Sequence, residues 1–177
     1  HDLHLDRQAG DRGGRLGTGV LSPLFADAGL TRNEAGELMM ASVPLEVIAE
    51  SVGTPTYVYN AGVVRERFRR LDEAFGSLPH RICYAVKANA NLAILRLMSE
   101  LGAGADIVSG GEMLRALAAG FPAERIVFSG VGKTDEELQA AITAGVGHIN
   151  VESVSELDRL AVLAGMQQAR VHIGIRI

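Results

Sequence analysis

The sequence predicts an α/β fold with a parallel sheet, and more specifically a partial (β/α)8 barrel of about five βα units. Short apolar segments alternate with helical segments, the helical segments end at glycines, and several of them begin with one shared pattern. Strands that alternate with helices form right-handed βαβ units and hence parallel sheets. An open doubly wound sheet satisfies the same pattern, but the repeat of roughly 18 to 25 residues is nearly uniform and favours the barrel.

The apolar segments that predict strands are 82–86, 104–108, 125–129, 148–151 and 170–177. The helices between them are predicted to close at Gly102, Gly120, Gly145 and Gly165, because glycine is preferred just past a helix C-terminus. Three helices begin with a hydroxyl residue and a glutamate three positions later: Ser109 with Glu112, Thr134 with Glu137, and Ser153 with Glu156. Each pair predicts a capping box, in which both side chains accept hydrogen bonds from free backbone N–H groups.

The segment before this repeat is less regular. Residues 1–30 are rich in Gly, Asp and Arg, and we expect them to form a mobile tail. Residues 36–51 predict a strand followed by a short helix, and 54–60 predict a β-rich run. Residues 61–76 carry apolar side chains at helical spacing and predict an amphipathic helix. The chain begins with His1 and stops within an apolar run, so we expect it to be a piece of a longer protein.

Composition excludes several classes of protein. Hydrophobic residues make up 47% of the chain, which is enough for a substantial core, and the net charge is −4. No basic cluster with interleaved aromatics indicates a nucleic-acid groove. The longest apolar stretches are far shorter than a membrane span. The five histidines and Cys83 lack ligand-like spacing, so no metal site is predicted. A single cysteine fits a reducing compartment, and we expect a cytoplasmic protein.

Lys87 is the first candidate for chemistry, because it directly follows an apolar strand segment. Functional residues of barrels and of doubly wound sheets lie at the carboxyl ends of the strands. A partly desolvated lysine at that position can act as a neutral amine and form a Schiff base with a carbonyl. The alternative is a lysine at the rim whose charged end reaches water.

Three further residues lie near strand ends or helix starts. Asp106 interrupts a small, apolar strand segment and could hold a cationic partner, or it is an ordinary turn carboxylate. Arg176 ends the last strand segment and would direct a permanent charge into the barrel mouth, or it pairs with an acid in a missing half. Glu112 is explained by its capping box alone.

Several separate motifs resemble the alanine racemase-like barrel enzymes that use pyridoxal phosphate. The run YAVKAN (84–89) resembles the cofactor-lysine motif of the diaminopimelate, ornithine and arginine decarboxylases of this family. GADIVSGGE (104–112) is similar to the second signature of the diaminopimelate branch, as are the runs 53–60, 126–138 and 149–160. Ornithine-type enzymes carry Cys-Ala-Ser after the aspartate, whereas this chain has Ile107-Val108-Ser109. The resemblance covers about residues 36–177.

The resemblance implies that Lys87 binds pyridoxal 5′-phosphate, with Asp106 and Arg176 near the cofactor. It also implies three regions: the tail 1–30, a segment of a second β-rich domain at 31–55, and an incomplete cofactor-binding barrel at 56–177. The implied reaction is the decarboxylation of meso-2,6-diaminopimelate to L-lysine and CO2, the last step of lysine biosynthesis, in a homodimer of the full-length protein. The alternatives are an ornithine- or arginine-type decarboxylase and a non-catalytic barrel that binds pyridoxal phosphate.

Overall fold

The computed structural model describes residues 21–177 and divides them between two compact units. The first unit ends at Val64 and the second covers Arg65–Ile177. Residues 1–20 of the predicted tail lie outside the described residues. The remainder of that tail holds a short helix, α1 (Pro23–Asp27), which the sequence did not predict.

The first unit contains a small antiparallel sheet of β1 (Leu30–Arg32), β2 (Leu38–Met40) and β3 (Val43–Pro44), in that order. Helix α2 (Leu45–Val52) follows directly. The strand and short helix predicted within 36–51 are therefore confirmed. Residues 54–60 form no strand, and Tyr57 and Tyr59 are exposed there. A β-prone run without a neighbouring strand has no partner for its backbone groups.

Helix α3 (Ala61–Phe75) confirms the helix predicted from the spacing of the apolar residues in this segment. None of its residues is fully buried in the described structure. The helix continues the chain from the first unit into the second.

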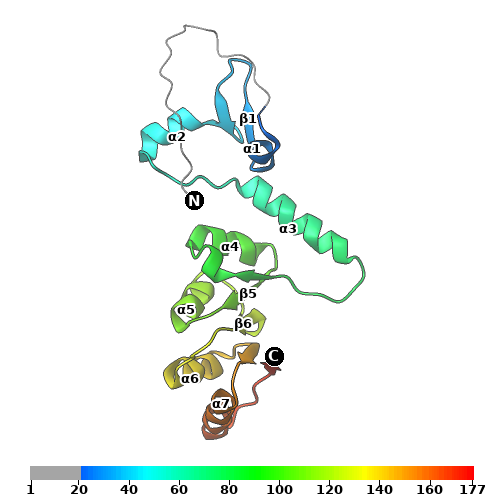
Figure 1. Ribbon diagram of the computed structural model, residues 1–177, viewed down its shortest axis with the longest axis vertical. Coiled ribbons are helices and arrows are strands. Elements are labelled where there is room, and N and C mark those ends of the chain that lie inside the picture. Colours follow the sequence, from blue (N-terminus) through cyan, green and yellow to red (C-terminus); the bar gives the residue numbers. More distant parts are fainter. Residues whose placement is uncertain (1–20) are drawn as a thin grey trace, which may run out of the picture. The chain divides into compact units, whose positions relative to one another are not determined.

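The second unit is a five-stranded parallel sheet with alternating helices (Figure 1). Its strands are β4 (Cys83–Ala85), β5 (Gly104–Ile107), β6 (Ile126–Phe128), β7 (His148–Val151) and β8 (Ile173–Ile175). Its helices are α4 (Leu92–Glu100), α5 (Gly110–Ala118), α6 (Asp135–Ala144) and α7 (Val154–Met166), with short 3-10 turns η1 (Val86–Ala88) and η2 (Ala123–Arg125).

The strand order decides between the two predicted architectures. The strands follow one another across the sheet in chain order, β4-β5-β6-β7-β8. A doubly wound sheet reverses its strand order at a switch point, whereas a barrel adds each strand to the same edge. The sheet is therefore part of a (β/α)8 barrel.

The two faces of the sheet differ in burial. Ala105 and Ile107 of β5 are fully buried, whereas Asp106 between them is half-buried on the opposite face. The neighbouring strands bury Ile126, Phe128 and Ile149 in the same way. Each large side chain in this layer contributes roughly 1.5–3 kcal/mol by leaving water. Burial of this apolar face thus fixes the register of strand pairing. Because side chains alternate along a strand, the polar residues then lie on the other face.

Four of the five strands are shorter than predicted, and only β7 has the predicted bounds. Strand β4 ends at Ala85, because the chain turns into η1 and buries the Val86 side chain completely. Strand β8 covers only Ile173–Ile175 of the predicted 170–177. It pairs only with β7, from Ile149↔Ile173 to Val151↔Ile175, so the length of β7 limits it.

The helix-end predictions are partly wrong. Gly102, Gly120 and Gly145 take positive φ values after their helices, as predicted. Gly165 lies inside α7, and Gln168 adopts the left-handed conformation instead, with φ 52°.

One of the three predicted capping boxes is complete. Thr134 and Glu137 bond reciprocally at the start of α6. Ser109 and Ser153 cap their helices through a hydroxyl oxygen, but the carboxylates of Glu112 and Glu156 have other partners. Both glutamates are therefore part of the tertiary structure beyond their own helix ends.

Candidate functional site

Lys87 lies at the carboxyl edge of the sheet, in η1, and its side chain is exposed. Ala85 is the register partner of Asp106, so Lys87 follows the β4–β5 ladder by two residues. In the described part of the chain, Lys87 makes no hydrogen bond or ion pair. Its amine is therefore available to a ligand.

The loop around Lys87 is held by its neighbours. Tyr84 Oη donates to the Asn89 carbonyl at 3.3 Å, and Arg115 Nε of α5 donates to the Ala90 carbonyl at 2.9 Å. Asn91 then caps α4 by accepting a hydrogen bond from the Ala93 N–H. These contacts fix the backbone that follows Lys87, while the Lys87 side chain remains free.

The chain has two lysines, and the second, Lys133, differs from Lys87 in both burial and bonding. Its side chain is 1% exposed, and its Nζ donates to the carbonyl oxygens of Gly130 and Asn150 at 2.7 and 2.8 Å. The same Nζ lies 2.9 Å from Glu156 Oε1. The Lys133 ammonium group is buried and paired with Glu156, so Lys87 is the lysine exposed to a ligand.

Asp106 belongs to a row of polar side chains across three strands. Ser129, just after β6, donates its hydroxyl to Asp106 Oδ1 at 2.6 Å, and Asn150 of β7 donates to Ser129 Oγ at 3.0 Å. The half-buried row fixes the position of the Asp106 carboxylate, because a charged acceptor strengthens a hydrogen bond. The sequence left open whether Asp106 holds a cation or is an ordinary turn carboxylate, and its partner among the described residues is the Ser129 hydroxyl.

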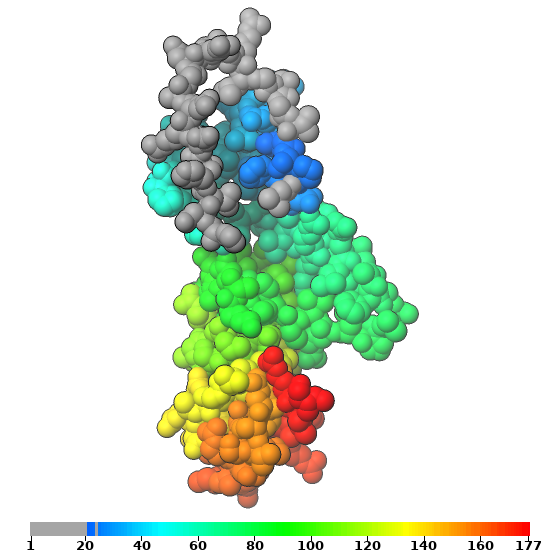
Figure 2. All heavy atoms as spheres, in the orientation of Figure 1, coloured from blue at the N-terminus to red at the C-terminus, as the bar shows by residue number. Residues whose placement is uncertain are grey.

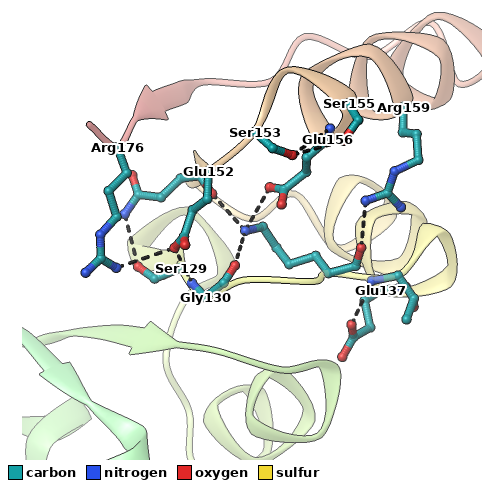
Figure 3. A network of polar contacts seen from close by, with 12 residues as sticks. Ser129, Gly130, Glu137, Glu152, Ser153, Ser155, Glu156, Arg159 and Arg176 are labelled. Carbon is teal, nitrogen blue, oxygen red and sulfur yellow. Dashed lines mark hydrogen bonds and ion pairs between the residues drawn. The ribbon is translucent and has the colours of Figure 1, made fainter.

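Arg176 follows β8 directly and is exposed, as the C-terminal residues are in Figure 2. Its guanidinium lies 3.4 Å from Glu152 Oε1, an oxygen that also accepts the Gly130 N–H at 3.1 Å. Arg176 therefore has its acidic partner, Glu152, within this chain. The alternative, in which an acid from a missing half pairs with Arg176, is not needed. Figure 3 shows Glu152 between Arg176 and Gly130.

Glu112 has a structural role. Its carboxylate accepts the Val108 N–H at 2.8 Å, one residue earlier in the chain than a capping box requires. Glu137 adds a second contact of this kind, since its Oε1 accepts the Gly110 N–H at 2.7 Å at the start of α5. The hydrogen bonds from the backbone of Gly110 and Thr134 lower the pKa of Glu137.

The structure places the three predicted residues along one edge of the sheet without joining them. Among the described residues, no hydrogen bond or ion pair links Lys87, Asp106 and Arg176 to one another. The sequence pattern assigned Glu156 only a capping role and did not single out Ser129, Asn150, Glu152 or Lys133. A polar Asn150 between two buried residues of β7 is the signal that could have identified that residue.

The described residues contain no group of three or more His, Cys, Asp or Glu side chains able to hold a metal. No helix among residues 21–177 is both long and apolar enough to cross a bilayer. The carboxyl edge therefore offers one free amine, a fixed carboxylate and an exposed guanidinium as its chemical groups.

The chain was compared with known proteins. A family model described as "Pyridoxal-dependent decarboxylase, pyridoxal binding domain" matches residues 61–177. A diaminopimelate decarboxylase of Pseudomonas fluorescens is 48% identical over 143 residues, which are 80% of this chain and 34% of the relative. The chain thus spans about a third of the length of this relative.

Solved structures agree with the sequence relatives. A crystal structure of an Aquifex aeolicus protein matches with a TM-score of 0.79 at 47% identity, over 84% of this chain and 36% of the other. A diaminopimelate decarboxylase of Helicobacter pylori complexed with L-lysine matches with a TM-score of 0.73 at 42% identity, over 75% of this chain and 34% of the other.

Proposed function

The chain belongs to the pyridoxal-dependent decarboxylase family, and we propose that it forms the cofactor-binding part of a diaminopimelate decarboxylase. The observation that carries this proposal is the contrast between the two lysines. Lys87 is exposed and unpaired at the carboxyl edge, while Lys133 is buried and occupied. A free amine at this edge is what an aldehyde cofactor requires.

The residues of the edge fit pyridoxal 5′-phosphate. Lys87 would hold the cofactor covalently through its amine. Asp106, fixed by Ser129 and Asn150, would present a carboxylate of defined position beside it. Arg176 is exposed and would supply positive charge to an anionic group. When bound, the cofactor supplies an electron sink for the electron pair left by a departing CO2.

The proposed substrate is meso-2,6-diaminopimelate, which loses one carboxylate as CO2 and gains a proton at the same carbon to give L-lysine. The names of the similar decarboxylases support this choice, and L-lysine is bound in the Helicobacter pylori structure. We also propose that the complete protein is a homodimer and that it is cytoplasmic, the latter because a single cysteine fits a reducing compartment.

Trapping of the cofactor tests the role of Lys87. The chain is incubated with pyridoxal phosphate and reduced with borohydride, and the modified peptide is identified by mass spectrometry. We expect an adduct on Lys87 and none on Lys133, because Lys133 is buried and paired with Glu156. Lys87→Ala should remove the adduct. Equal labelling of Lys133, or unchanged labelling of Lys87→Ala, would contradict the assignment.

Activity tests the reaction itself. A hybrid enzyme carries residues 61–177 in place of the matching segment of the Pseudomonas fluorescens relative. We expect it to release CO2 from meso-2,6-diaminopimelate, and Lys87→Ala to lower kcat by more than about a thousandfold. Preferential release of CO2 from ornithine or arginine would support the alternative substrate class. Cofactor trapping without any decarboxylation would support a non-catalytic binding role.

A further inference from the structure

Lys133 and Glu156 form an ion pair inside the second unit. They are the two buried charged residues of the described chain, with side chains 1% and 3% exposed. Lys133 lies in the loop before α6, and Glu156 lies in the first turn of α7. The pair is held by charge at 2.9 Å, since no donor is aligned for a hydrogen bond to Glu156 Oε1 among the described residues.

The ammonium group of this pair holds two neighbouring strand ends. Lys133 Nζ donates to the carbonyl of Gly130, which follows β6, and to the carbonyl of Asn150 in β7. The Gly130 peptide is also held from its other side, because its N–H donates to Glu152 (Figure 3). We call Lys133, Glu156 and these two carbonyls the Lys133 clamp.

The clamp acts on the residues that hold Asp106. Asn150 is itself clamped through its backbone, and its side chain donates to Ser129 Oγ. Ser129 directly precedes the clamped Gly130, and its hydroxyl donates to Asp106 at 2.6 Å. A displaced backbone at either position would move the donors that orient the Asp106 carboxylate.

Stability alone does not account for a pair of this kind. Removing two charges from water is costly, and replacing a buried ion pair by apolar residues of similar volume is often neutral or stabilising. A hydrophobic residue at position 133 could fill the space beside Phe128, whose ring centroid lies 5.6 Å from Nζ. It could not hold two carbonyl oxygens.

We propose that Lys133 and Glu156 are positioning residues, which set Ser129 and Asn150 and through them the Asp106 carboxylate beside the cofactor lysine. This inference rests on the proposed function of the carboxyl edge. It assigns Lys133 no contact with cofactor or substrate.

The test uses the hybrid enzyme and the double variant Lys133→Met/Glu156→Leu, which leaves no buried charge unpaired. We expect its melting temperature to equal or exceed that of the parent. We expect kcat to fall about tenfold or more, with KM within about twofold, because misplaced groups act on the reacting geometry. The matched control is Arg70→Met/Glu66→Leu, an exposed pair on α3 that should change neither constant.

A mutant cycle with Ser129→Ala separates positioning from a merely structural role. In the parent, we expect Ser129→Ala to lower kcat about tenfold. In the variant without the clamp it should lower kcat less than about twofold, because the hydroxyl has already lost its position. A stable double variant with parental kcat, or equal losses from Ser129→Ala in both backgrounds, would overturn the proposal.

Amide hydrogen exchange gives a readout that does not depend on activity. In the 177-residue chain, we expect the Gly130 and Ser129 amides to exchange at least about tenfold faster without the clamp, and unchanged in the α3 control. Unchanged exchange would refute the clamp even if the enzyme is active. Faster exchange in a chain that fails to trap pyridoxal phosphate on Lys87 would refute the proposed function and retain the clamp. If the double variant does not fold, Glu156→Gln replaces it in both measurements, with a smaller change of the same sign.

Discussion

Both edges of the parallel sheet carry polar side chains, but the two edges use them differently. At the carboxyl edge, Asp106, Ser129 and Asn150 form one connected row, and Lys133 fixes the strand ends beside it. The amino edge has a hollow of about 670 Å3 lined by Pro79, His80, Arg81, Cys83, Val127, Gly147, His148, His172 and Ile173. Within the described chain, the side chains of His148 and His172 make no hydrogen bond there. Residue type therefore does not identify the site, whereas the row of side-chain hydrogen bonds from strand to strand does.

The direction of the helices explains this difference. Each loop at the carboxyl edge leads into a helix N-terminus, where free N–H groups attract carboxylates and hydroxyls. Glu137 accepts the N–H groups of Gly110 and Thr134, which lie at the starts of α5 and α6. Each loop at the amino edge leaves a helix C-terminus, which ends in carbonyl groups and is closed by a glycine such as Gly102 or Gly145. Polar side chains are therefore bound at the carboxyl edge, whereas at the amino edge glycines allow backbone segments to lie close to one another.

Gly147→Ala tests the packing of the amino edge and has the largest expected effect. A Cβ at this position would lie 2.1 Å from the Glu124 carbonyl oxygen, a backbone atom that cannot move freely. We expect the free energy of unfolding to fall by about 3 kcal/mol, measured by urea unfolding of the chain.

Gly165→Ala is the matched control for that substitution. Gly165 lies inside α7, and a Cβ there meets no atom within 4 Å. Alanine is the better helix former, so we expect the free energy of unfolding to rise by about 0.5–1 kcal/mol. Equal destabilisation by both substitutions would show that the close approach at Gly147 does not matter.

Much of this comparison could be predicted from the sequence, because local signals determine it. Apolar runs located all five parallel strands, and the glycines at 102, 120 and 145 marked the helix ends. Lys87, Asp106 and Arg176 were selected because they follow or interrupt apolar runs, and each lies at or near the carboxyl edge. The network that fixes them could not be predicted, since its bonds join residues more than 15 positions apart.

The capping boxes show the limit of local signals most directly. The same pattern occurs three times, and a reciprocal bond forms only at Thr134 and Glu137. Glu156 turns instead to Lys133, because that ammonium group is buried beside it and needs a counter-charge. Whether the glutamate completes its capping box depends on a tertiary partner, and the spacing of residues within one helix does not predict that partner.

Glu137→Gln tests the carboxyl edge, with an intermediate expected effect. The carboxylate accepts the Gly110 and Thr134 N–H groups, so we expect a loss of about 1 kcal/mol of unfolding free energy at neutral pH. The folded-state pKa of Glu137 lies below its ordinary value of 4.5. Its contribution is therefore present above pH 4.5 and is lost as pH falls through the lower folded-state pKa. Urea unfolding of both proteins at neutral and acidic pH should show the difference shrinking with acid; a constant difference would exclude a role for the charge.

His80 tests the amino edge, with the smallest expected effect and the opposite pH dependence. Its ring stacks on Phe75, and its two nitrogens face the Leu78 carbonyl at 2.8 Å and Asp72 Oδ1 at 2.9 Å. Both partners are acceptors, so the protonated ring satisfies both, and they raise the pKa of His80 above 6.5. Because the folded-state pKa is raised, the stabilisation is fully present below pH 6.5 and is lost as pH rises through the folded-state value.

An NMR titration of the His80 ring measures this shift directly, and Asp72→Asn is the matched variant because it retains an acceptor without the charge. We expect the titration midpoint to move downward in Asp72→Asn, while the Leu78 carbonyl and nearby Arg81 remain in place. A midpoint that does not change would assign the shift to the backbone carbonyl alone. In either case acid should weaken the carboxyl edge at Glu137 and base should weaken the amino edge at His80, because one edge holds carboxylates with N–H donors and the other holds an imidazolium with acceptors.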